Sequence, residues 1–165
     1  MSKHARHLLV IMAAGLMIIV GLVIVSIHPV DRYQRLQCGE KLKALGYAIR
    51  VYQTGHGHLP RQLSVLSNDL LSPSLLICPG SGHAPGSFQN ANTWTDYAFM
   101  DWALFLGTNT VPGDYPIAYD RSIRSHVGRG VNVLNVNGLV RWDPAAQSLV
   151  AFAAEHPEVK LRIPE

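Results

Sequence analysis

The sequence predicts an α+β fold in which a long N-terminal helix packs on a small antiparallel sheet. Two patterns predict the helix: an unbroken apolar run from Leu8 to Ile27, and apolar residues at helical spacing from Asp31 to Tyr52. The dipeptide Asn137-Gly138 lies between two stretches rich in β-branched residues and predicts a β-hairpin.

The run from Leu8 to Ile27 has the length that a helix needs to cross a bilayer, which is about 20 residues. Lys3 and Arg6 precede it and favour a cytoplasmic N-terminus. The alternative is a cleaved signal peptide, but the run exceeds the roughly 7–15 apolar residues of such signals, and no A-x-A-like site follows. We therefore expect a single-pass protein of the inner (cytoplasmic) membrane. Residues 1–28 would form the cytoplasmic tip and transmembrane helix, and 29–165 a periplasmic or extracellular α+β domain.

The second helical pattern is amphipathic. We expect its apolar face to dock on the core of the domain, and glycines and a proline within 54–60 to end the helix. Further along, we expect a short helical or turn-rich stretch, a brief strand or buried connector at 74–80, and a strand at Tyr97–Met100. The expected docking face consists of Leu36, Leu42, Leu45, Ile49 and Tyr52.

A two-residue turn at Asn137-Gly138 would pair Leu134 with Arg141 and Val133 with Trp142. The remaining segment is expected to form a terminal helix over the sheet, with Leu149, Phe152 and Ala153 at helical spacing. The expected core face of the hairpin carries Val131, Val133, Val140 and Trp142.

Composition limits the partners and the chemistry. The chain carries 14 Lys+Arg against 11 Asp+Glu, and no basic stripe alternates with aromatic residues, so nucleic acid is not an expected partner. The two cysteines, Cys38 and Cys78, are candidates for a structural disulfide. Two separately buried thiols are the alternative, and the sequence leaves both open.

Histidines in the loops suggest a metal site. His56 and His58, joined by His83 and Cys78, offer ligands suited to zinc or copper. Two histidines on a glycine turn supply only half of a structural zinc site, so we expect solvated loop residues and assign no metal ligand and no cofactor.

Three other groups of residues suggest a nucleophile pair, a calcium site and a basic binding surface. Ser125 and His126 with Asp120 could form a nucleophile pair, but no nucleophile-elbow motif is present, and no catalytic residue is assigned. Asp114 and Asp120 could bind calcium, although the carboxylates are few and dispersed. The arginines at 121, 124 and 129 are more typical of a solvated surface than of a binding site.

Three segments carry a family resemblance. Residues 38–60, CGEKLKALGYAIRVYQTGHGHLP, are similar to a segment of type IV pilins and type II secretion pseudopilins, which they match at Leu42, Lys43, Gly46, Ala48, Tyr52, Gly57 and Pro60. LLICPG, residues 75–80, resembles the Cys-Pro segment of that family, and HVGRGVNVLNVNGLVRW, residues 126–142, resembles its C-terminal hairpin, which reads Asp-Gly at the turn.

The resemblance implies a pilin-like fold and a non-catalytic, membrane-anchored subunit or accessory of an envelope pilus or type II secretion-type assembly. The implied partners are the membrane, pilin-like or secretion-system subunits and, in a homo-oligomer, copies of the chain itself. The chain departs from the family in that residues 7–22 contain no glutamate, and no Gly precedes a Phe-Thr-Leu-x-Glu-like start. That departure favours the alternative of a non-polymerising, membrane-tethered binding domain. A third reading is a membrane-anchored metal-binding protein or enzyme.

Overall fold

The computed structural model describes residues 3–66, 71–102 and 111–165, and it gives side chains for most of these except a few before residue 11 and those of 23–30. The chain divides into two compact units, Met1–Tyr33 and Gln34–Glu165. Helix α1 (Lys3–His56) contributes to both.

The prediction of a membrane-spanning helix is wrong. Among the described residues, no helix is both long enough and apolar enough to cross a membrane. The described apolar side chains of α1 extend from Ile11 to Leu22, while those of 8–10 and 23–27 lie outside the described part. The prediction of a single-pass protein of the inner membrane is therefore wrong as well.

The second unit has the predicted α+β architecture. Its sheet is antiparallel, with four strands in the order β1-β2-β3-β4. Each strand neighbours the next one along the chain, so the sheet is a simple meander. The strands are β1 (Tyr97–Phe99), β2 (Pro116–Asp120), β3 (Gly130–Asn135) and β4 (Val140–Pro144).

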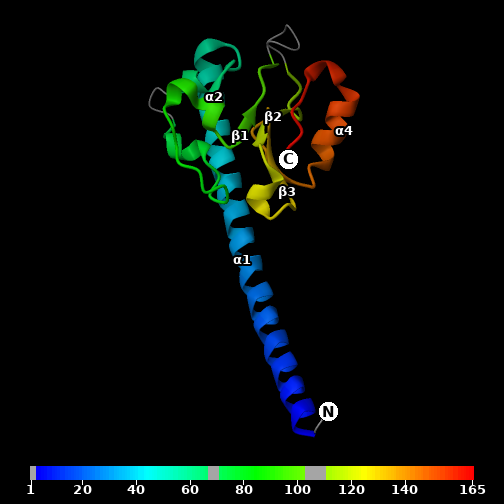
Figure 1. Ribbon diagram of the computed structural model, residues 1–165. Helices are drawn as coiled ribbons and strands as arrows, with labels where there is room; N and C mark the ends of the chain where they lie inside the picture. The colour runs from blue at the N-terminus through cyan, green and yellow to red at the C-terminus, as the bar shows by residue number, and fades with distance from the viewer. Residues whose placement is uncertain (1–2, 67–70, 103–110) are drawn as a thin grey trace. The chain divides into compact units, whose positions relative to one another are not determined.

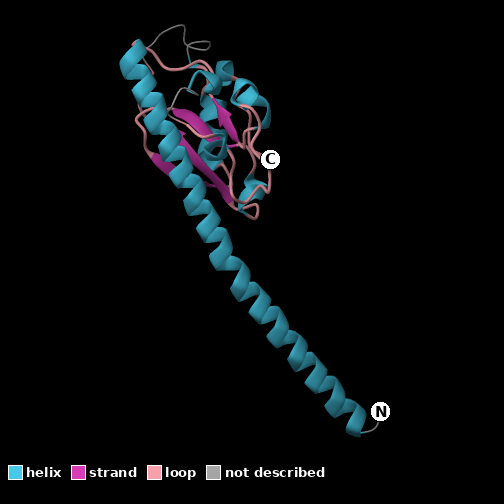
Figure 2. Ribbon diagram, turned by 90° about the vertical axis from the view of Figure 1, so that its left-hand side faces the viewer, coloured by secondary structure: helices cyan, strands magenta, loops and turns pink. Residues whose placement is uncertain are grey.

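Residues 34–56 of α1 lie along one face of this sheet (Figure 2). The expected docking face is confirmed for Leu42, Leu45 and Ile49, which are buried, whereas Leu36 is 56% exposed. A close approach of helix and strand occurs at Gly46, where a Cβ atom would lie 2.9 Å from Cδ1 of Leu134. A larger residue at this position would therefore require the Leu134 side chain of β3 to move.

The hairpin between β3 and β4 is shifted by one residue from the predicted register. Leu134 pairs with Val140, and Val133 with Arg141. Gly138 has a φ of 86°, and its N–H donates to Asn135 O over 2.9 Å, so the loop has three residues with glycine in the left-handed position. Because side chains alternate between faces, the shift moves Val140 away from Val131 and Val133.

The predicted core face of the hairpin is therefore corrected. Val140 and Trp142 share the face of Asn132 and Leu134, toward α1, and Arg35 of that helix stacks over the Trp142 ring at 4.6 Å from its centroid. β3 is buried on both faces because α1 covers one of them and the rest of the domain covers the other.

The opposite face carries Val131, Val133 and Asp143 and is covered by helix α4 (Gln147–Glu155), the predicted terminal helix (Figure 1). The carboxylate of Asp143 accepts hydrogen bonds from the backbone N–H groups of Ser148 and Leu149, at 3.0 and 3.1 Å. It thus pairs two of the N–H groups that a helix leaves unsatisfied at its start.

Short elements connect the helix and the sheet. The expected strand near residue 97 is confirmed as β1. The 74–80 segment begins within the 3₁₀ helix η2 (Pro73–Leu76) and continues as a connector in which Ile77 and Cys78 are buried. The 3₁₀ helix η1 (Leu63–Leu66) matches the expected helical stretch after the first glycine turn, whose continuation at 67–70 lies outside the described residues. The remaining elements are η3 (Phe88–Asn90), α2 (Ala91–Trp94), η4 (Ile123–His126) and η5 (Pro157–Val159).

A first prediction tests the close approach of α1 to β3. Gly46→Leu forces a side chain against buried Leu134, so we expect it to lower the free energy of unfolding by about 1–3 kcal/mol. Gly55→Leu is the matched control, because a Cβ atom at Gly55 has nothing within 4 Å and leucine favours the helix. Urea denaturation followed by circular dichroism measures both, and equal midpoints for the two variants would contradict the packing.

A second prediction concerns alkaline pH. Burial raises the pKa of Tyr119 from the ordinary 10 to about 12, and the charges of Arg162 and Arg121 offset part of this rise. The phenol, which donates to Arg162 O over 2.8 Å, stays protonated in the folded protein while it ionises in the unfolded chain. The free energy of unfolding should therefore be constant with respect to this group below pH 10 and fall between pH 10 and about 12.

Tyr119→Phe should make that decline shallower, measured as urea midpoints at several pH values from 9 to 12. Tyr47→Phe is the control, because it removes the same hydroxyl from a residue that is 68% exposed. A slope unchanged in Tyr119→Phe would show that this phenol does not contribute to alkaline unfolding.

Candidate functional site

A fully buried polar cluster lies between α1 and the sheet. It is assembled from segments that are distant in the sequence: α1, the connector after η2, the ends of β1, β2 and η4, and the middle of β3. All of its side chains are at most 5% exposed. We call it the Asp120 cluster, and it consists of Cys38, Cys78, Tyr97, Asp120, His126 and Asn132.

Cys38 and Cys78 form a disulfide, which settles the choice between a bridge and two thiols. Their Cα atoms are 5.4 Å apart, a separation typical of such bridges. The bond joins α1 to the connector across 40 residues. In the chain-entropy model, a cross-link that closes a loop of that length stabilises the fold by about 4 kcal/mol. The bridge therefore fixes the helix to the part of the domain that surrounds the sheet.

The carboxylate of Asp120 organises the rest of the cluster. Its Oδ2 atom accepts hydrogen bonds from the backbone N–H and the side-chain amide of Asn132, at 2.6 and 3.0 Å. The same oxygen lies 3.0 Å from Nε2 of His126, and that nitrogen lies 3.7 Å from Sγ of Cys78. One carboxylate thus ties β2 to β3 and to η4.

Tyr97 completes the cluster on the side of α1. Its hydroxyl donates to Sγ of Cys38, 3.6 Å away. Burial raises the pKa of this phenol, and the negative charges of Asp120 and Asp96 raise it further. The hydroxyl therefore remains a neutral hydrogen-bond donor at ordinary pH.

Ser125 and His126 do not form the nucleophile pair that was considered. The His126 ring contacts Asp120 and Cys78 inside the domain, whereas Ser125 lines an open pocket on the surface. The hydrogen-bond partner of the buried His126 ring is the carboxylate of Asp120. The sequence signal that could have indicated the Asp120–His126 pair was the presence of an aspartate six residues before the histidine.

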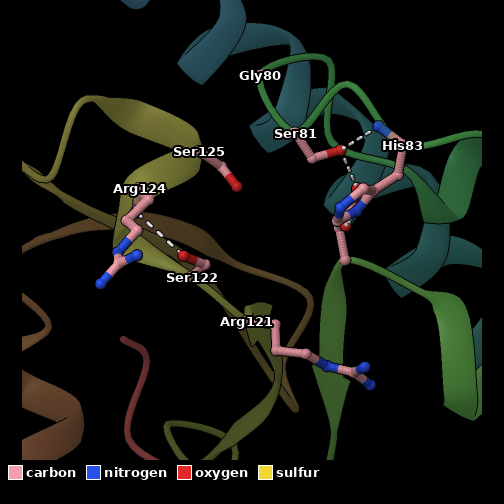
Figure 3. Close-up of a pocket in the computed structure, with 8 residues that line it drawn as sticks. Gly80, Ser81, His83, Arg121, Ser122, Arg124 and Ser125 are labelled. Carbon is pink, nitrogen blue, oxygen red and sulfur yellow. Dashed lines mark hydrogen bonds and ion pairs between the residues drawn. The ribbon is translucent and has the colours of Figure 1, made fainter.

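The surface pocket has a volume of about 280 Å³ and is lined by Ser81, His83 and Asp96 on one side (Figure 3). Asp96 Oδ1 lies 2.6 Å from Nδ1 of His83, and Oδ2 accepts from the Ser81 hydroxyl at 2.5 Å. The serine hydroxyl therefore contacts the carboxylate and not the free imidazole nitrogen, which is unlike a catalytic triad.

Two arginines border the same pocket, but their guanidinium groups diverge. Figure 3 shows the ends of Arg121 and Arg124 pointing in different directions. Arg121 donates to the carbonyls of Asn92 and Tyr97, and burial, followed by the charge of Arg162, lowers its pKa. The pocket does not present the convergent donors that an anion site requires.

The histidines and the cysteine considered as metal ligands, but not assigned as such, are not brought together. His56 and His58 remain at the end of α1, where their ring centroids are 6.2 Å apart and their Nδ1 atoms contact backbone carbonyls. His83 pairs with Asp96, and Cys78 is in the disulfide. Within the described residues, the grouping with metal-ligand spacing is Cys38, Cys78 and His126, in the Asp120 cluster.

The calcium hypothesis is also not supported. Asp120 is buried beneath α1, whereas Asp114 is exposed in the turn before β2. These two carboxylates therefore do not share a site. Asp114 is left as a solvated loop residue, as the sequence favoured.

No protein-family model, curated protein or solved structure matches this chain. Its function is therefore argued from its own residues and geometry.

A third prediction tests the role of the central carboxylate. Asp120→Ala leaves the N–H of Asn132 and the ring of His126 buried without their acceptor, so we expect a loss of about 3–5 kcal/mol in the free energy of unfolding. Asp114→Ala, at an exposed position, is the control and should change stability by less than about 0.5 kcal/mol. Similar urea midpoints for the two variants would contradict the proposed role of Asp120.

Proposed function

We propose that this protein is a non-catalytic, pilin-like subunit that assembles with pilin-like partners, including copies of itself, through the apolar part of its N-terminal helix. The observation that carries the proposal is the exposure of the side chains between Ile11 and Leu22. The large ones are 45–74% exposed in the single chain: Ile11, Met12, Leu16, Met17, Ile18, Ile19, Val20 and Leu22.

These side chains surround the helix. The five consecutive residues 16–20 are all apolar and exposed, and the four steps of about 100° between them cover the whole circumference. A helix that is apolar on every side is normally buried in the core of a larger structure. In this proposal, the apolar helices of neighbouring subunits cover this surface.

The magnitude of the burial favours several neighbours. Covering a Leu, Ile or Met side chain completely contributes about 1.5–3 kcal/mol, and the exposed fractions reduce that to roughly 1–2 kcal/mol each here. The eight side chains together then contribute roughly 8–16 kcal/mol, which is comparable to the cost of association, about 4–15 kcal/mol. A single partner would cover only one side of the helix, so the proposed assembly places several helices around each one.

The resemblance of residues 38–60, 75–80 and 126–142 to pilins and pseudopilins supports the same proposal. In that family the apolar helices pack together while the heads contact one another. Residues 7–22 contain no acidic side chain, so the helices in this proposal associate by apolar packing alone.

The fourth prediction tests assembly. In sedimentation velocity experiments on the full chain at increasing concentrations, we expect discrete species larger than the monomer. The double variant Leu16→Lys, Ile19→Lys places charges on the exposed helix and should shift the distribution to the monomer at concentrations at least tenfold higher.

Leu139→Lys is the matched control. Leu139 is 60% exposed, close to the 63% of Leu16, but it lies in the β3–β4 turn and should leave assembly unchanged. A wild-type chain that remains a soluble monomer at every concentration would contradict the proposal and favour the non-polymerising binding domain. Unaltered association in the double variant would also contradict it.

A further inference from the structure

We propose that the Asp120 cluster is a redox-gated binding site for a thiophilic divalent cation such as zinc, which forms when the Cys38–Cys78 disulfide is reduced. The ligands are the two cysteine thiolates, the imidazole of His126 and the carboxylate of Asp120. Candidate ligand atoms of Cys38, Cys78 and His126 all lie within 4.8 Å of one another.

Two of the distances among these atoms are close to those of a tetrahedral site. Zinc binds sulfur at about 2.3 Å and nitrogen or oxygen at about 2.0–2.2 Å, which places a sulfur and a nitrogen ligand about 3.5 Å apart. Sγ of Cys78 and Nε2 of His126 are 3.7 Å apart. Nε2 of His126 and Oδ2 of Asp120 are 3.0 Å apart, against about 3.3 Å for a nitrogen and an oxygen on one ion.

The carboxylate of Asp120 has a buried oxygen, Oδ1, that is of a type that binds metals and has no hydrogen-bond partner within the described parts of the chain. Asp120 is 1% exposed, and an unpaired polar atom at such a position costs about 1–3 kcal/mol. A cation bound within the cluster would pair with the Asp120 carboxylate and remove part of that cost.

The disulfide determines whether the site exists. A dithiol reductant transfers two electrons and two protons, which breaks the Cys38–Cys78 bond and leaves two thiols, while the reductant becomes a disulfide. Binding of the cation then releases both thiol protons, because thiolates are the ligands. The His126 imidazole binds through Nε2 in its neutral form, with its proton on Nδ1.

Surrounding contacts favour a site that persists after reduction. Asn132 donates to Asp120 from both its backbone and its side chain, and the Tyr97 hydroxyl donates to Sγ of Cys38. Hydrogen bonds of this kind orient metal ligands and stabilise charge on a thiolate. Unlike the loop histidines, this set of ligands is positioned by α1, β2 and η4 together.

Cobalt(II) is the probe for the test, because two thiolate ligands give it an intense sulfur-to-metal absorption band in the near ultraviolet. The full chain is reduced with a phosphine, which leaves no competing thiol, and Co²⁺ is added to the folded protein and also during refolding from urea. We expect one Co²⁺ per chain with the band present in the reduced protein, and no band in the oxidised protein. Zinc should displace the cobalt and abolish the band.

Variants locate the site. His126→Gln should weaken Co²⁺ binding at least tenfold, and the double variant Cys38→Ser, Cys78→Ser should show no band. His83→Gln is the matched control, because this histidine also pairs with an aspartate but lies on the surface with 66% of its side chain exposed. It should bind Co²⁺ as the wild type does.

The wild-type comparison remains decisive if a variant fails to fold. Zinc should raise the thermal unfolding midpoint of the reduced wild type and leave that of the oxidised protein unchanged. Absence of the band in the reduced protein, a band equal in the double serine variant, or the same zinc effect in both redox states would each overturn the proposal.

Discussion

The buried carboxylate of Asp120 is the interaction on which the second unit depends. It lies at the end of β2 beneath α1, and it accepts hydrogen bonds from β3 and contacts the histidine that ends η4. Removal of a carboxylate from water is costly unless several donors compensate, so these partners have to be in place for the domain to close. The disulfide beside it provides a covalent link between α1 and the same region.

The packing of α1 on the sheet follows from small side chains and from register. Gly46 allows the helix to approach Leu134, and a Cβ atom at Gly39 would lie at ordinary contact distances from Asn132 and Val140. The three-residue loop of the hairpin then decides that Val140 and Trp142 lie on the helix side. Had the loop contained two residues, the same sequence would have presented Arg141 to α1, with an unpaired charge in the interface.

The two compact units differ in how far their described apolar side chains are buried. Residues 34–165 bury a core of their own, which includes Trp102, Tyr97 and Tyr119. The described side chains of the first unit between Ile11 and Leu22 are mostly exposed. A unit with a buried core and a helix with exposed apolar side chains are the two features on which the proposed assembly role rests, whereas the metal proposal rests only on the interior of the domain.

Local patterns in the sequence determined the elements of the domain. Helical spacing identified the buried face of Leu42, Leu45 and Ile49 and the terminal helix around Leu149. β-Branched residues around Asn137-Gly138 identified the hairpin. These signals can be read from the sequence because they depend on residues only a few positions apart. The tertiary structure alone decided the hairpin register, the disulfide and the meeting of Asp120, His126 and Cys78. It also corrected the membrane assignment, since an apolar run indicates that a helix will be buried but does not indicate whether lipid or protein covers it. The disulfide and the contact of Cys78 with His126 join residues 40 or more positions apart. Such contacts depend on how the helix and the sheet pack together, which local periodicity does not indicate.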